Sequence, residues 1–209
     1  MFFDYFGIIA LRGETIGIKS KKENNMKATG IVRRIDELGR VVIPKEIRRT
    51  LRIREGDPLE IFVDREGGVI LKKYSPIGEL GDFAKEYAES IHRSVGRITA
   101  ICDMDTVIAA SGAGRKELEG KPVNEALEAV IVSRKRTVAE SAKGDTLIPV
   151  TAENGDPGYA AELIVPITAS GDPIGAVILL SKEEGANISE SDIKVCETAA
   201  SFMGKQMES

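Results

Sequence analysis

Residues 26–51 read MKATGIVRRIDELGRVVIPKEIRRTL, and this stretch decides the fold of the N-terminal part of the chain. The runs 29–35 and 40–43 are rich in β-branched residues, which fit the pleated surface of a sheet, so each is predicted to be a short strand. The sequence DELG between them ends in a glycine that can reverse the backbone, which predicts a turn. Two further strands are predicted over 59–64 and 69–73, around a Gly-Gly turn.

A short helix is predicted after the second of these strands. Pro44 suits the first helical position, where no amide donor is needed, and the helix is expected to reach about Leu51. Like charges on one helical face repel each other, and phosphates along a duplex would relieve that repulsion, although a solvated basic face is the alternative. The basic residues at helical spacing on this face are Lys45, Arg48, Arg49 and Arg52.

Charge is divided unevenly along the 209 residues, whose formal net charge is −4. Residues 26–73 carry 12 basic and 8 acidic side chains, whereas residues 74–209 carry 13 basic and 22 acidic ones. This asymmetry suggests that the basic segment meets a polyanion. A segment of about 50 residues can bury little surface, so we expect it to complete its core as an intertwined dimer.

The quoted stretch closely resembles the AbrB family of bacterial transition-state regulators, and the resemblance continues through residues 59–63 and 70–74. The resemblance implies a swapped-hairpin β-barrel formed by a dimer, with double-stranded DNA as the partner. By the same resemblance, the DNA-contacting arginines of the family map onto this chain, with two helpers. These arginines are Arg33, Arg40, Arg48 and Arg49, and the helpers are Arg34 and Lys27.

The whole of 26–209 resembles AbrB-family members from spore-forming bacteria that carry an appended GAF-like domain. The match is strong in the first module and at 171–177, GDPIGAV, and looser between them. The implied role is the activation or repression of genes of the developing spore, by a cytoplasmic protein of the nucleoid.

Residues 77–209 are predicted to form a second domain, with an antiparallel sheet and flanking helices, after a linker near Tyr74. This order of elements fits a GAF/PAS-like fold, which makes the fold class of the chain α+β. Such domains often hold a small ligand, but no motif here identifies one. The expected helices are 80–95, 124–133 with Asn124 as cap, and one from Ser189 with Asp192 in a capping box; the expected strands are 98–102, 106–110, 161–168 and 174–181.

The first and last helices of this domain both carry apolar stripes. These stripes can pack within the domain or against another chain, and the second arrangement would turn the N-terminal dimer into a homotetramer. The basic run 134–136 at a helix end is interpreted as complementing the helix dipole, with a second DNA contact as the alternative.

Other classes of function find little support in the sequence. His92 lies in an amphipathic pattern, and no nucleophile has an evident base partner, so catalysis is not expected. Cys102 and Cys196 are far apart and are interpreted as small buried residues, so neither a metal nor a cofactor is expected. No apolar run has the length of a membrane span. A toxin-binding antitoxin and a DNA-coating nucleoid protein remain as alternatives.

Three regions are therefore expected. Residues 1–25 are predicted to be a loosely ordered extension without a function, 26–75 the DNA-binding module, and 77–209 a sensor or assembly domain.

Overall fold

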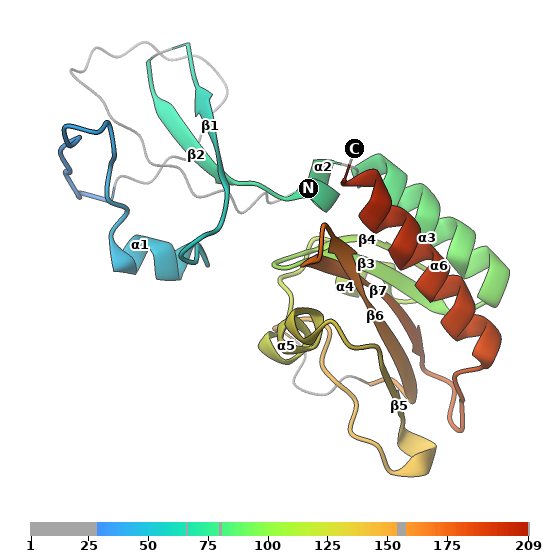
Figure 1. The fold of residues 1–209 in the computed structure, drawn as a ribbon. Helices are drawn as coiled ribbons and strands as arrows, with labels where there is room; N and C mark the ends of the chain where they lie inside the picture. Colours follow the sequence, from blue (N-terminus) through green and yellow to red (C-terminus); the bar gives the residue numbers. More distant parts are fainter. Residues whose placement is uncertain (1–28, 66, 80, 154–157, 209) are drawn as a thin grey trace, which may run out of the picture. The chain divides into compact units, whose positions relative to one another are not determined.

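The computed structural model describes residues 29–65, 67–79, 81–153 and 158–208. The chain divides into two compact units, one ending at Tyr74 and the other beginning at Ser75 (Figure 1). No helix in these ranges is long and apolar enough to cross a membrane. The predicted extension 1–25, Lys27 and Leu80 lie outside the described residues.

The N-terminal unit contains one short helix and one hairpin. Helix α1 spans Lys45–Thr50, which confirms the predicted short helix, but Pro44 is its N-cap with an extended backbone and not its first residue. Strands β1 (Leu59–Val63) and β2 (Val69–Lys73) pair antiparallel, with Leu59 opposite Lys73. This pairing confirms the second predicted strand pair.

The first predicted strand pair is not formed within the chain. Residues 29–35 and 40–43 do not form strands. The backbone bonds here are confined to the turn, where the Asp36 amide donates to the Arg40 carbonyl (3.0 Å) and the Gly39 amide to the Asp36 carbonyl (3.0 Å). A strand requires a neighbour that accepts and donates backbone hydrogen bonds, and the described part of a single chain offers these segments none.

The C-terminal unit is built on a five-stranded antiparallel sheet with the order β4-β3-β7-β6-β5 (Figure 1). Four of its strands coincide with the predicted ones. Strand β5 was not predicted, because four residues of mixed character carry too little periodicity. The strands are β3 (Ile98–Asp103), β4 (Val107–Ser111), β5 (Thr137–Glu140), β6 (Ala161–Ala169) and β7 (Asp172–Ser181).

Helices cover both faces of this sheet (Figure 1). Helices α3 (Gly81–Val95) and α6 (Glu190–Gln206) lie side by side on one face, so their apolar stripes are used, at least in part, within the domain. The opposite face is packed by α5 (Glu125–Ser133) and the short α4 (Arg115–Leu118). The remaining elements are α2 (Pro76–Glu79) and a 3₁₀ turn, Ser141–Lys143.

The helix starts follow the predicted capping. The Asn124 side chain accepts from the Ala126 amide (2.9 Å) at the start of α5. At α6, Ser189 and Asp192 form both halves of a capping box, which satisfies two amides that the helix itself cannot. Asp192 also accepts from Arg97 Nε at 3.0 Å, so this cap ties α6 to the loop before β3.

Helix α6 approaches β6 very closely at Gly204. A Cβ atom at this position would overlap the Thr168 carbonyl oxygen. Glycine is therefore required here by packing, since its φ is not in the left-handed region.

The Gly204→Ala substitution is expected to destabilise the C-terminal domain by about 1–3 kcal/mol, because the methyl group must displace backbone. In an ordinary helix interior the same change stabilises by about 1 kcal/mol. Thermal or urea unfolding measures the effect, with Ser201→Ala on the exposed side of the same helix as the control. A more stable Gly204→Ala variant would contradict this packing.

Candidate nucleic-acid interface

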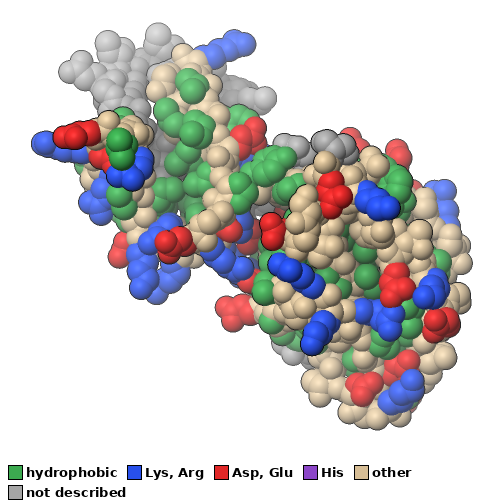
Figure 2. Space-filling view, viewed as in Figure 1, with side chains coloured by type: hydrophobic (Ala, Val, Ile, Leu, Met, Phe, Trp, Pro, Cys, Tyr) green, Lys and Arg blue, Asp and Glu red, His purple; other side chains and the backbone are tan. Residues whose placement is uncertain are grey.

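The basic residues of the N-terminal unit lie mostly at its surface. Figure 2 shows Lys and Arg side chains gathered around α1. Lys45 and Arg49 on this helix are exposed. The other exposed members of the predicted set are Arg33, Arg34, Arg40 and Arg52.

The predicted basic stripe on the helix needs correction at Arg52. Helix α1 ends at Thr50, and Arg52 has a left-handed backbone (φ 51°), so Arg52 does not continue the helical face. The Ile53 amide donates to the Arg48 carbonyl (2.8 Å), which closes the end of the helix in place of a further turn. The sequence showed the spacing of these residues but not the early end.

Arg48 is only half-exposed, unlike its neighbour Arg49. It borders a pocket of about 360 Å³ that Val42, Ile43 and Ile53 also line. The Arg48 Nε is buried and finds no hydrogen-bond partner among the described residues. A buried donor of this kind costs about 1–3 kcal/mol when unpaired, so an acceptor from a ligand or a second chain is expected to satisfy it.

Arg40 is held by the turn that precedes it. Its Nε donates to Asp36 Oδ2 at 2.8 Å, while the Asp36 Oδ1 accepts from the backbone amides of Arg40 (2.8 Å) and Leu38 (3.0 Å). The hydrogen bond from the Arg40 amide has the largest effect on Asp36, followed by the one from the Arg40 side chain. Both lower the pKa of Asp36, so its carboxylate is ionised at neutral pH.

Apolar side chains of the same unit are also exposed. Val32 is 85% exposed and Val63 is 73% exposed. Among the described residues of this unit, no Ile, Leu, Val or Phe side chain is fully buried. The other exposed ones are Ile31, Ile35, Leu38, Val42, Ile61 and Phe62.

The start of the C-terminal unit is anchored to its own sheet. Ser75 Oγ donates to Asp103 Oδ2 at 2.6 Å, and Ile77 of α2 is fully buried. The other Asp103 oxygen accepts from the Asp105 and Thr106 amides (2.8 and 2.7 Å). Asp103 therefore organises a turn, and Asp105 contributes its amide to it.

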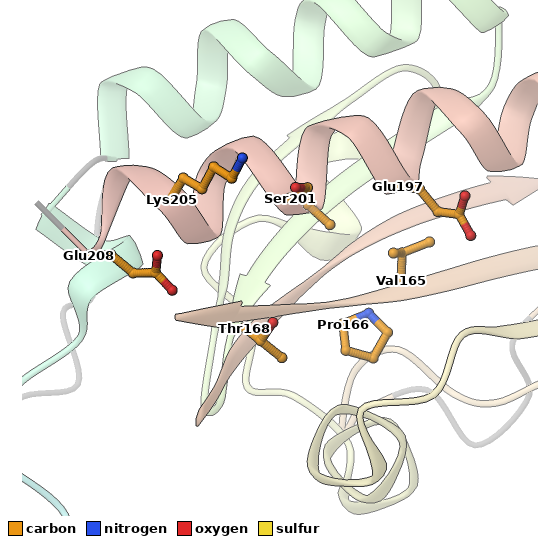
Figure 3. A pocket seen from close by; sticks show the side chains of 8 residues that line it. Val165, Pro166, Thr168, Glu197, Ser201, Lys205 and Glu208 are labelled. Atoms are coloured by element: carbon orange, nitrogen blue, oxygen red, sulfur yellow. The ribbon is translucent and has the colours of Figure 1, made fainter. Parts of the chain in front are cut away.

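A groove between α6 and β6 encloses about 330 Å³ (Figure 3). Val165, Pro166 and Thr168 line it from the strand, and Glu197, Ser201 and Lys205 from the helix. This set contains no nucleophile with a base partner and identifies no ligand.

The basic run 134–136 lies near acidic side chains of the same unit. Arg136 Nη1 lies 2.5 Å from Glu197 Oε1, and Arg134 Nη2 lies 3.8 Å from Asp172 Oδ1. These ion pairs weaken the alternative of a second DNA contact, because part of the positive charge is already compensated.

Glu162 on β6 is a feature that the sequence interpretation missed. Its side chain is fully buried; Oε1 accepts from the Ile148 amide at 2.8 Å, and Oε2 has no partner in the described part of the chain. Burial raises the pKa of Glu162 to about 7. The signal was present in the sequence, since 161–167 reads AELIVPI, an acidic residue at the head of a buried apolar run.

The two cysteines are free and buried, as predicted. Burial raises the pKa of Cys196 to about 12, and burial also raises that of Cys102, so both are poor nucleophiles. Within the described ranges, no group of three or more His, Cys, Asp or Glu side chains could hold a metal ion.

Two family models match the chain. The model described as "Stage V sporulation protein T C-terminal, transcription factor" matches residues 79–208. The model described as "Antidote-toxin recognition MazE, bacterial antitoxin" matches residues 32–79.

Two proteins of Bacillus subtilis (strain 168) are similar in sequence. Stage V sporulation protein T is 56% identical over 184 residues, which cover 88% of this chain and 99% of that protein. Transition state regulatory protein AbrB is 71% identical over 51 residues, which cover 24% of this chain and 52% of that protein.

Solved GAF domains share the fold of the C-terminal unit. The GAF domain of Thermosynechococcus elongatus PixJ, in its blue-light absorbing form, aligns with a TM-score of 0.53 at 13% identity, over 65% of this chain and 89% of that one. The GAF domain of an Acinetobacter phosphoenolpyruvate-protein phosphotransferase aligns with a TM-score of 0.51 at 13% identity, over 61% and 81%. The predicted GAF-like fold is thereby confirmed.

The titration of Glu162 makes a prediction for stability. An unfolded glutamate titrates near 4.5, so between that pH and about 7 the folded protein keeps a proton that the unfolded chain releases. The stabilisation is complete below pH 4.5 and is lost as pH rises through about 7. The Glu162→Gln variant is expected to be more stable than the parent at pH 8 by about 1–3 kcal/mol. Unfolding at several pH values tests this, with the exposed Glu183→Gln as the control; equal stability at pH 8 would contradict it.

Proposed function

Since this chain belongs to the stage V sporulation protein T family of transcription factors, we propose that it regulates transcription by binding double-stranded DNA through residues 26–75. The observation that carries the proposal is the collection of exposed arginines on this small module, beside a half-buried Arg48 whose Nε has no acceptor among the described residues. The planar guanidinium of arginine has paired N–H donors that fit the oxygens of a phosphate and the O6 and N7 acceptors of guanine. The DNA-contacting set would be Arg33, Arg34, Arg40, Lys45, Arg48, Arg49, Arg52 and Lys27.

We propose that two copies of the module share one β-barrel by exchanging hairpins. Residues 29–35 and 40–43 have no strand partner in the part of the chain that the structure describes, and several of their apolar side chains are exposed, as are those of β1. A second chain would supply the missing ladder hydrogen bonds and bury these side chains. It would also place two sets of arginines at a fixed spacing along a duplex.

The C-terminal domain is proposed to sense a small ligand or to assemble two dimers into a tetramer. A cluster of Phe83, Tyr87 and Phe202 supports assembly. Their ring centroids lie 5.0–6.0 Å apart across α3 and α6, and Phe202 is 40% exposed. An aromatic cluster with an exposed member is typical of an interface between helices.

Within this proposal the protein acts in the cytoplasm, at genes of the developing spore, as activator or repressor. We propose no catalytic role, since the described cysteines are buried and free and the grooves hold no activated nucleophile. The match to an antitoxin model over 32–79 fits the shared N-terminal fold, whereas toxin binding would need a tail in place of the folded GAF-like domain.

The alternative of a DNA-coating nucleoid protein differs in sequence preference. A salt titration of binding to promoter and random duplexes separates the two. A steep dependence with a promoter preference supports a regulator, and a steep dependence without one supports coating. No binding at low salt would refute both.

The Arg49→Ala substitution is expected to weaken binding and to reduce the slope of log affinity against log salt by about one, because one phosphate contact is lost. Circular dichroism should show no change, since Arg49 is exposed. Lys116→Ala in the C-terminal unit removes the same charge and serves as the control. Equal slopes for the parent and Arg49→Ala would exclude a phosphate contact at this position.

The Ile61→Asp substitution is expected to dissociate the N-terminal dimer, because it places a charge among apolar side chains that a second copy would bury. Ile61 is 66% exposed in the single chain, so a monomeric module would tolerate the change. Sedimentation of residues 26–75 and of the full chain measures it. The control is Glu60→Gln on the other face of the strand, and an unchanged dimer for Ile61→Asp would contradict the shared barrel.

A further inference from the structure

We infer that Asp36 is a positioning residue that sets the DNA selectivity of Arg40, a role that rests on the DNA-binding function proposed above. The two residues flank the turn 36–40, and each is tied to the other through both backbone and side chain. Asp36 itself would not read a base; it would act through the arginine.

The geometry of the turn leaves Arg40 little freedom. The Asp36 amide donates to the Arg40 carbonyl (3.0 Å), and the Arg40 amide donates back to Asp36 Oδ1 (2.8 Å). The remaining Asp36 oxygen accepts from Arg40 Nε at 2.8 Å. The guanidinium is therefore fixed at its base by a charge-assisted hydrogen bond, which is among the stronger kinds in proteins.

Fixing the Nε leaves the outer edge of the guanidinium, with Nη1 and Nη2, to face a ligand. The Arg40 side chain is 70% exposed, so this edge is accessible. Two parallel donors match the O6 and N7 acceptors of guanine, or two oxygens of one phosphate, only when the plane of the fork is correctly oriented. An untethered arginine can instead reach whichever phosphate is near, and phosphate contacts carry no sequence information.

The Asp36 carboxylate has a cost for affinity. It is 41% exposed and ionised at neutral pH, so it repels the phosphates that Arg40 approaches. A negative charge in this place reduces binding to every duplex. Its presence beside an arginine proposed to contact DNA is explained if it restricts that arginine to the duplexes that fit.

Glu37 provides a matched control for this charge. It is the next residue in the same turn and is exposed, and no bond joins it to Arg40 in the described structure. Glu37→Gln and Asp36→Asn each remove one negative charge from the turn, but only the second releases the guanidinium. An asparagine at 36 can still accept from the Leu38 and Arg40 amides, so the turn is preserved.

The experiment uses the full-length protein, one duplex selected by it from a random pool, and a scrambled duplex of the same composition. Both variants are expected to bind the scrambled duplex more tightly than the parent, by similar factors, because each loses one repelling charge. Only Asp36→Asn is expected to lower the ratio of selected to scrambled affinity, by about fivefold or more, which is the discrimination that one bidentate base contact provides.

The same variants carried on an Arg40→Lys background test the coupling. Lysine keeps the charge but has no planar fork, so Arg40→Lys alone should lower the ratio, and adding Asp36→Asn should not lower it further. Sedimentation and circular dichroism of every variant show whether the dimer and the overall fold are intact.

Three results would overturn the inference. These are an equal ratio for Asp36→Asn and the parent, an equal loss of ratio in Glu37→Gln, and a parent protein without any preference between the two duplexes. Failure of the parent to bind any duplex at low salt would instead refute the proposed function itself.

Discussion

Burial of apolar surface is the constraint on which the N-terminal unit depends. Its described residues form one helix of six residues and one hairpin, and these cannot enclose Val32, Ile61 or Val63. Small domains bury a small fraction of their surface, so this burial only marginally offsets the conformational entropy of folding. A second copy, as proposed, would supply the missing apolar surface, and the spacing of the two sets of arginines would then be set by the shared core.

The C-terminal unit meets the same constraint by itself. Its sheet carries packed helices on both faces, and strands such as β7 are buried on both sides. At Gly204, where α6 meets β6, and at Gly175, where β7 meets β3 within the sheet, a Cβ atom would collide with a backbone carbonyl oxygen. The buried Glu162 is an exception within this core, and it makes part of the stability dependent on pH. The first residues of this unit are fixed to its sheet, since Ser75 donates a hydrogen bond to Asp103 and Ile77 is buried.

Much of the fold could be predicted from the sequence because its signals are local. The capping residues Asn124 and Ser189 and the four longer strands of the GAF-like sheet lie where the pattern indicates. The first strand pair is not formed among the described residues, and in the proposed dimer its partner strands would come from a second chain. The early end of α1 depends on the left-handed backbone of Arg52. Glycine is the usual residue in this conformation, so an arginine here does not predict the end of a helix. The Asp36–Arg40 pair is a matter of side-chain geometry, which residue spacing alone does not determine.

The exposed segment before α1 in the N-terminal unit also bears on how the protein is made. Residues 29–43 leave the ribosome before the GAF-like domain has been synthesised, and in the proposed dimer their backbone groups and apolar side chains would face solvent until a second copy binds. Unpaired strand edges of this kind are prone to aggregation and attract chaperones. A nearby nascent chain on the same messenger RNA is the partner at the highest local concentration. Pairing between neighbouring ribosomes would therefore favour homodimers over mixed pairs with related proteins that share this module.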